Sequence, residues 1–250
     1  MELILILFGL IVGSFVNALI YRVPRSLGMN GRSMCPSCKT TVAWYDLVPL
    51  FSFLFLRGRC RKCRQTISLT YPLVELLTAF SFWQIGRSFN LTFNNTIFLI
   101  YSLFLVSIFI ALLFIDLKHY ILPDEFIFSG FLVSIGFLIA FPQDIKEKIA
   151  GVILWGGMFF IIHLISKGKW MGFGDVKLAV LIGLVFGLLE GLFVVYLAIF
   201  AGFIVSIALM LTSRASLKTK IPFGSFLAGA SIIFLLFGKI TDSILRFLFL

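Results

Sequence analysis

Residues 96–115 read TIFLIYSLFLVSIFIALLFI, a stretch of 20 residues without a charged side chain. Because a helix needs about 20 mostly apolar residues to cross a bilayer, this stretch predicts a transmembrane helix. The rest of the chain is similar: of its 250 residues, 60% are hydrophobic and 13% are charged. A soluble domain has about 45–50% apolar and 25% charged residues. The composition therefore excludes a soluble enzyme and indicates a polytopic membrane protein.

Hydropathy and helix-breaking residues predict eight spans, at residues 2–21, 72–86, 96–115, 125–141, 149–165, 177–189, 192–212 and 223–238. No basic residue precedes the first span, so we expect it to be retained as a signal anchor. The expected fold is all-α, with about eight transmembrane helices and one soluble connection. This gives three regions: a first helix at 1–21, a soluble module at 22–71 and a multi-helix membrane domain at 72–250.

The basic residues indicate an orientation. The chain has 21 Lys and Arg against 11 Asp and Glu, a formal net charge of +10. Cytoplasmic connections carry the excess of positive charge in membrane proteins, and 16 of the 21 basic residues follow the first, third, fifth and seventh spans. We therefore expect both termini outside and the 22–71 module in the cytosol. Topology explains the charge, and no nucleic-acid partner is expected.

All four cysteines lie in the 22–71 module, in two C-x-x-C pairs. Cys35 and Cys38 form the first pair and, after 21 intervening residues, Cys60 and Cys63 form the second. This spacing is typical of a zinc ribbon, in which four thiolates hold a structural Zn²⁺. Metal binding would also supply the folding energy that 50 residues lack.

Two alternatives to zinc are two structural disulfides and a redox C-x-x-C. The expected cytosolic location disfavours disulfides, and the pairing of two motifs without a βαβ pattern disfavours redox chemistry. The basic residues around the second pair either contact anionic lipid headgroups or are only the positive-inside signal, which we favour; they are Arg57, Arg59, Arg61, Lys62 and Arg64.

Two aspartates at the membrane edge are candidate catalytic residues. Asp116 ends the 96–115 span, and Asp175 lies in Gly172-Phe173-Gly174-Asp175 at the entry to the sixth span. Two carboxylates brought together can share one proton, so that one activates water and the other protonates the amide. Gly172 and Gly174 would allow a tight turn and close approach of a substrate. The alternative is that Asp175 caps a helix and Asp116 is an interfacial charge beside Lys118.

Two further acidic residues have supporting roles in this interpretation. Asp124 follows Pro123 and precedes an apolar run, so we expect it to be a helix N-cap. It is also a second-choice candidate for the catalytic pair of aspartates. Glu75 lies about one turn inside the second span and should face protein or a cavity, near the active site or against a neighbouring helix.

Motifs over nearly the whole chain resemble those of the bacterial type IV prepilin peptidases, membrane aspartyl proteases of the GxGD kind. Leu47-Val48 is a small departure, where members often have Asn-Ile. The matching motifs are both cysteine pairs, Gly13-Ser14-Phe15-Val16-Asn17, Tyr21-Arg22-Val23-Pro24, Trp44-Tyr45-Asp46, Pro49-Leu50, Arg57-Gly58-Arg59-Cys60, Tyr71-Pro72-Leu73-Val74-Glu75, Ile115-Asp116, Leu122-Pro123-Asp124, Gly172-Phe173-Gly174-Asp175-Val176-Lys177 and Ile221-Pro222-Phe223-Gly224.

The resemblance implies catalysis by Asp116 and Asp175, with Lys177 in the same motif. It implies cleavage of the basic leader of prepilins or pseudopilins at the cytosolic face of the inner membrane, in pilus, type II secretion or competence systems. It further implies N-methylation of the new N-terminus with S-adenosylmethionine. Gly58, Gly13 and Asn17 are weak candidates for the S-adenosylmethionine site.

Two rivals to this bifunctional enzyme remain. One is a non-enzymatic membrane sensor or assembly factor whose zinc loop binds a cytosolic partner. The other is a peptidase that has lost methylation. The sequence leaves the substrate and the oligomeric state open.

Overall fold

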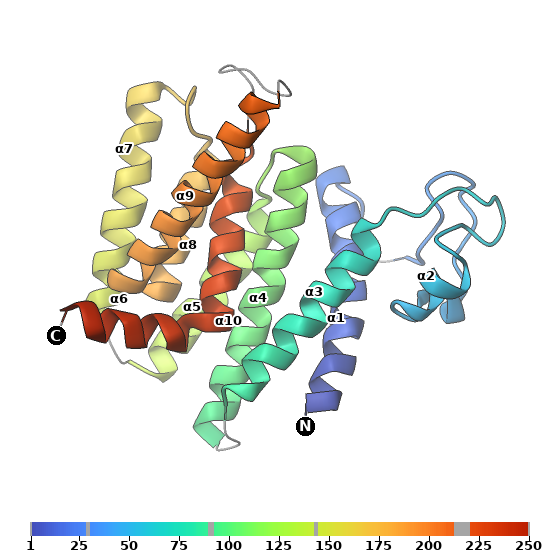
Figure 1. Ribbon diagram of the computed structural model, residues 1–250, viewed down its shortest axis with the longest axis horizontal. Coiled ribbons are helices and arrows are strands. Elements are labelled where there is room, and N and C mark those ends of the chain that lie inside the picture. Colours follow the sequence, from blue (N-terminus) through green and yellow to red (C-terminus); the bar gives the residue numbers. More distant parts are fainter. Residues whose placement is uncertain (1, 29–30, 90–92, 143–144, 213–220, 250) are drawn as a thin grey trace. The chain divides into compact units, whose positions relative to one another are not determined.

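The computed structural model describes residues 2–28, 31–89, 93–142, 145–212 and 221–249, and in these residues the regular structure is helical (Figure 1). The all-α prediction is therefore confirmed. The helices are α1 (Glu2–Arg22), α2 (Phe51–Phe55), α3 (Thr70–Arg87), α4 (Phe93–His119), α5 (Asp124–Ala140), α6 (Ile145–Gly151), α7 (Gly157–Ser166), α8 (Phe173–Phe186), α9 (Leu189–Leu211) and α10 (Phe223–Phe249). Short 3₁₀ turns occupy Val23–Arg25 and Trp44–Leu47, and a π-helical turn, Val152–Gly156, joins α6 to α7.

Each of the eight predicted spans coincides with a helical stretch, but the helices differ in their capacity to cross a bilayer. Four described stretches are long and apolar enough: Glu2–Arg25, Asn95–His119, Ile145–Ser166 and Leu189–Leu211. A shorter apolar helix covers Phe223–Gly238. Helix α8 has 14 residues, or about 21 Å at 1.5 Å per residue, less than the roughly 30 Å of a hydrocarbon core. The number of eight spans stays a prediction.

The chain divides into two compact units, Met1–Ala111 and Leu112–Leu250. The first unit groups α3 with α1, whereas the sequence analysis assigned residues 72–250 to one membrane domain. These two helices run antiparallel with their backbones very close: a Cβ added at Gly9 would lie 2.7 Å from the Cα of Ala79, and one at Gly13 would lie 2.8 Å from the Cα of Glu75. Small residues permit this close packing of membrane helices.

The second unit is built around α8. Leu178, Leu181 and Ile182 on this helix are fully buried, and its backbone nearly touches that of α6, where a Cβ at Gly183 would lie 2.5 Å from Gly151. Neighbouring helices α5, α6, α9 and α10 all contact α8. A short helix enclosed in this way buries its apolar surface against protein, which explains why it need not be long enough to span.

Candidate active site

Asp116 lies in the last turns of α4 and is buried, with 5% of its surface exposed. Its Oδ2 accepts a hydrogen bond of 2.6 Å from the backbone N–H of Ser225, in the first turn of α10. The first N–H groups of a helix lack intrahelical partners, and a carboxylate is favoured at this positive end. Asp116 is therefore held in place by the start of α10.

Asp175 is the third residue of α8 and caps its own helix. Its Oδ2 accepts a hydrogen bond of 3.2 Å from the backbone N–H of Gly172, which is the N-cap residue. Asp175 thus caps α8 from its third residue and is not itself the N-cap. It leaves the other carboxylate oxygen, Oδ1, pointed toward α10, as its distance to Gly224 shows.

Gly224 brings the two carboxylates to one point. A Cβ added at Gly224 would lie 3.0 Å from Oδ2 of Asp116 and 3.1 Å from Oδ1 of Asp175. These two oxygens are therefore no farther apart than the sum of the two distances. Such a pair of carboxylates, with room between them, is suited to activate a water and protonate a leaving group. The sequence analysis singled out the Ile221-Pro222-Phe223-Gly224 motif but missed Gly224 as a site residue.

Leu122 explains why glycine stands at two positions. A Cβ at Gly224 would lie 2.7 Å from Cδ1 of Leu122, and a Cβ at Gly174 would lie 3.1 Å from Cβ of Leu122. Gly172 is extended, at φ −70° and ψ 152°, and neither it nor Gly174 is among the residues with positive φ. The backbone N–H of Asp175 donates to the carbonyl of Gly172 at 3.2 Å, so the chain turns into α8 here without positive φ. At Gly174 the lack of a Cβ makes room for Leu122, and close approach of a substrate at these glycines stays a prediction.

Asp124 is not the N-cap that the sequence predicted. Pro123 occupies that position, and Asp124 begins α5. Its carboxylate instead forms an ion pair with Lys177 of α8, with Nζ–O distances of 2.6 and 2.8 Å. The carboxylate therefore joins α5 to α8 through a charge-assisted hydrogen bond. Lys177 also lies over the ring of Phe173, with 5.2 Å from Nζ to the ring centroid.

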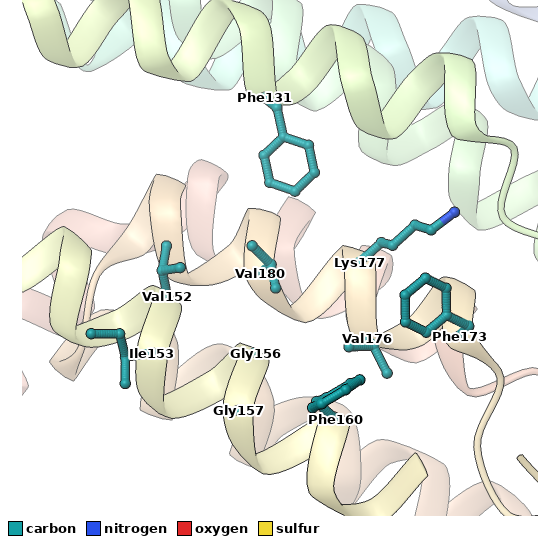
Figure 2. A pocket seen from close by; sticks show the side chains of 10 residues that line it. All are labelled: Phe131, Val152, Ile153, Gly156, Gly157, Phe160, Phe173, Val176, Lys177 and Val180. Carbon is teal, nitrogen blue, oxygen red and sulfur yellow. The ribbon is translucent and has the colours of Figure 1, made fainter. Parts of the chain in front are cut away.

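A groove of about 440 Å³ runs along α8, between it, α5 and the Val152–Gly157 stretch (Figure 2). Side chains from α5, from the Val152–Gly157 stretch and from α8 face into it, and Lys177 is the charged residue among them. Phe173 and Val176, which line it, flank Asp175 in the sequence. The full lining is Phe131, Val152, Ile153, Gly156, Gly157, Phe160, Phe173, Val176, Lys177 and Val180. Neither aspartate is among these lining residues, but the groove is apolar and lies on the same helix as Asp175.

The four cysteines form one cluster in the first unit. Their Sγ atoms all lie within 4.8 Å of one another, with 3.8 Å between Cys35 and Cys63. A tetrahedral Zn²⁺ with Zn–S bonds of about 2.3 Å places sulfurs about 3.8 Å apart. All four are free cysteines. The donor set and its geometry therefore fit zinc, which would be held by four thiolates with no position left for catalysis.

The two cysteine pairs share one backbone pattern. The N–H of Cys35 donates to the carbonyl of Thr40 at 2.9 Å, and that of Cys60 donates to the carbonyl of Gln65 at 2.8 Å. Isolated bridges close both turns, Met34 with Thr41 and Arg59 with Thr66. The module is therefore a structural repeat that the sequence analysis did not detect, because only the cysteine spacing recurs clearly.

The thiols of the cluster differ in acidity. Hydrogen bonding with Thr40 lowers the pKa of Cys38 to about 6. At Cys63 a hydrogen bond with the Gln65 backbone acts to lower the pKa, but desolvation and the neighbouring thiols outweigh it and raise the pKa to about 11. Zinc binding must displace the protons that remain, so zinc affinity should rise with pH.

Glu75 and the weak cofactor candidates have structural roles in the first unit. Glu75 is buried, as expected, and accepts a hydrogen bond of 2.9 Å from the backbone N–H of Leu50. Asn17 donates to the carbonyl of Tyr71 at 2.9 Å, Gly13 packs against α3, and Gly58 has φ +66° beside the ring of Phe53. Each of these residues therefore makes a contact within the first unit, and a part in cofactor binding stays a prediction.

Two family models match the chain. One is described as Bacterial Peptidase A24 N-terminal domain, over residues 7–89, and the other as Type IV leader peptidase family, over residues 103–207. Between them they include the cysteine cluster and both aspartates. No solved structure is significantly similar to the chain.

Curated relatives carry the name prepilin leader peptidase/N-methyltransferase. The protein from Aeromonas hydrophila is 32% identical over 96% of this chain and 91% of its own length, and that from Bacillus subtilis is 32% identical over 98% and 96%. The Myxococcus xanthus protein is 36% identical over 86% of this chain, which covers 65% of that relative. The resemblance seen in the sequence is confirmed, and the chain belongs to the type IV leader peptidase family.

Proposed function

We propose that this protein cleaves the basic leader of prepilins or pseudopilins and N-methylates the new N-terminal residue. The main observation in support of peptidase activity is that one carboxylate oxygen of Asp116 and one of Asp175 both lie close to Gly224. The names of the curated relatives support the choice of substrate. The distribution of basic residues supports cleavage at the cytosolic face of the inner membrane.

In this mechanism one aspartate is ionised and the other is protonated. The ionised carboxylate takes a proton from a water molecule, and the oxygen of this water attacks the carbonyl carbon of the scissile amide. The protonated carboxylic acid donates its proton to the amide nitrogen as the C–N bond breaks. The backbone N–H groups of Ser225 and Gly172 each hold one carboxylate oxygen, which fixes the geometry of both groups before the substrate arrives.

The groove beside α8 is proposed to take the apolar segment of the substrate. Phe173 and Val176, which flank Asp175 in the sequence, are part of its lining, and this lining is apolar except for Lys177. A substrate helix lying there would present the junction with its basic leader to the aspartates. The ionised carboxylate of the pair would attract that basic leader electrostatically.

The proposed methyltransferase activity is supported by the names of the curated relatives. S-adenosylmethionine would supply the methyl group, and the residues that bind it are not assigned. A peptidase without methylation would release an unmodified N-terminus. The mass of the product, incubated with and without S-adenosylmethionine, distinguishes the two.

The test is to incubate the purified protein with a prepilin and determine the product by mass spectrometry. Asp116→Asn and Asp175→Asn should each lower cleavage by about 10³-fold or more, because each removes one proton-transfer group. Glu125→Gln, which removes an exposed carboxylate from α5, is the matched control and should cleave normally. Full activity in either asparagine variant, in a folded and inserted protein, would refute the aspartyl mechanism and favour the non-enzymatic rival.

A further inference from the structure

Helix α2 and the second cysteine turn form one rigid piece. The backbone N–H of Gly58 donates to the carbonyl of Phe53 at 2.8 Å. A Cβ at Gly58 would lie 3.0 Å from Cζ of Phe53, so the ring packs directly on this backbone. The positions of Arg57 and Arg59 are therefore fixed relative to the side chains of α2.

The residue directly before this piece is tied to α3. The backbone N–H of Leu50, directly before α2, donates to Oε2 of the buried Glu75. The Cα of Glu75 in turn lies against Gly13. The start of α2 is thus held near the N-terminal end of α3, of which Glu75 is the sixth residue.

The outer surface of this piece is apolar and aromatic. Phe51, Leu54 and Phe55 of α2 are 58%, 70% and 85% exposed, and Trp44 and Tyr45 are also exposed. Monomeric soluble proteins rarely expose contiguous apolar side chains in this way. Aromatic residues gather at the interface between water and hydrocarbon, and apolar helix faces bury themselves at the acyl boundary.

An arginine-lined pocket of about 560 Å³ adjoins the end of α2. Its lining is Phe55, Leu56, Arg57, Arg59, Arg61 and Arg64. Arg61 pairs with Asp46, at 2.6 Å between Nη2 and Oδ1. Within the described residues the other three arginines have no carboxylate partner. Guanidinium groups bind phosphate through paired hydrogen bonds.

We propose that α2 lies in the bilayer interface and that the arginine pocket binds the phosphate of an anionic lipid headgroup. Phe51, Leu54 and Phe55 would contact acyl chains, while Arg57, Arg59 and Arg64 contact the headgroup. A lipid rather than free phosphate is the ligand because the apolar side chains of α2 continue directly into the pocket at Phe55. The cysteine cluster would then hold these arginines at the depth of the lipid headgroups.

The full chain is reconstituted in nanodiscs of phosphatidylcholine with phosphatidylglycerol, and the lipids it retains are measured by native mass spectrometry. The wild-type protein should enrich phosphatidylglycerol. The triple variant Arg57→Gln/Arg59→Gln/Arg64→Gln should lower this enrichment about tenfold or more. Arg32→Gln/Lys39→Gln/Lys62→Gln removes the same charge from the module outside the pocket and should change it less than about twofold. An equal fall in both variants would refute the pocket, and displacement of the lipid by millimolar inorganic phosphate would show a free-phosphate site.

A second measurement avoids any folding defect in the arginine variant. A photo-crosslinking amino acid replaces Phe55 in the otherwise unchanged chain, whose zinc content is checked first. Illumination in the same nanodiscs should yield a lipid adduct at position 55. A crosslink to a second copy of the chain, or no adduct in the bilayer, would overturn the proposed membrane contact of α2.

Discussion

The cysteine cluster and the aspartate pair reach their geometry in opposite ways. Each cysteine pair is held by a tight turn within its own C-x-x-C segment, closed by hydrogen bonds between residues five apart. The aspartates are positioned by α4, α8 and the start of α10, and Ser225 lies 109 positions from the Asp116 that it holds. The geometry of a site built from local turns depends on its ligand residues and on the metal that they bind. The geometry of a site built from packed helices depends on the residues at which those helices contact one another.

The largest effect is expected from removing a cysteine. Cys60→Ser should abolish stoichiometric zinc binding and the fold of the module, because binding of structural zinc supplies about 10–16 kcal/mol in small zinc modules. Ser37→Ala, inside the first cysteine turn but with no ligand removed, should retain zinc. The zinc content and the amide hydrogen exchange of both variants are measured. In Cys60→Ser the amides of α8 should stay protected from exchange, because α8 lies in the other unit. Normal zinc content in Cys60→Ser would show that four thiolates are not the site.

A methyl group between the aspartates tests the second kind of site. Gly224→Ala should lower the rate of cleavage by about 10²-fold, since a displacement of roughly 1 Å at a catalytic group has that effect. The added carbon would meet Asp116, Asp175 and Leu122. Gly229→Ala in the same helix, where a Cβ would lie 3.9 Å from Leu113, is the control. Equal activity of the two variants would contradict the placement of the carboxylates around Gly224.

Filling the groove should weaken substrate binding without disturbing the fold. At Gly157 an added Cβ meets nothing within 4 Å, so Gly157→Leu places its side chain in the groove. We expect the KM for a prepilin to rise roughly tenfold with kcat little changed, the pattern of lost binding. Gly136→Leu, at an equally open position away from the groove, should leave KM unchanged. If the wild-type protein cleaves and Gly157→Leu has the same KM, the substrate lies elsewhere.

The smallest effect is expected at Lys177. Its ion pair with Asp124 is partly exposed, with side-chain exposures of 27% and 49%, and such pairs contribute about 0–1 kcal/mol. Lys177→Gln should therefore lower the free energy of unfolding by less than about 1 kcal/mol and the rate of cleavage by less than about fivefold. Lys169→Gln is the comparison variant. A much larger loss of cleavage would assign Lys177 a direct part in catalysis.

The cysteine site was predictable because its information is local. The spacing of Cys35, Cys38, Cys60 and Cys63 specifies four ligands, and the structure gathers them. The aspartate pair was predictable in part: the cost of charge near a bilayer selects Asp116 and Asp175 from only 11 acidic residues. Gly224 was missed because a glycine carries no sign of which side chains approach it. Asp124 was misplaced as an N-cap because its partner, Lys177, is distant in sequence.

The sequence by itself determined that this is a helical membrane protein of the type IV leader peptidase family, with a four-cysteine module and two aspartates. Apolar runs, the scarcity of charge and the C-x-x-C spacing are local properties of the sequence. They can be recognised without knowing which helices pack together. Only the tertiary structure decided that α8 is enclosed by other helices, that Gly224 leaves space between the carboxylates, and that the residue before α2 is bound to Glu75 of α3. These features depend on which helices pack together, and packing follows from shape across distant segments.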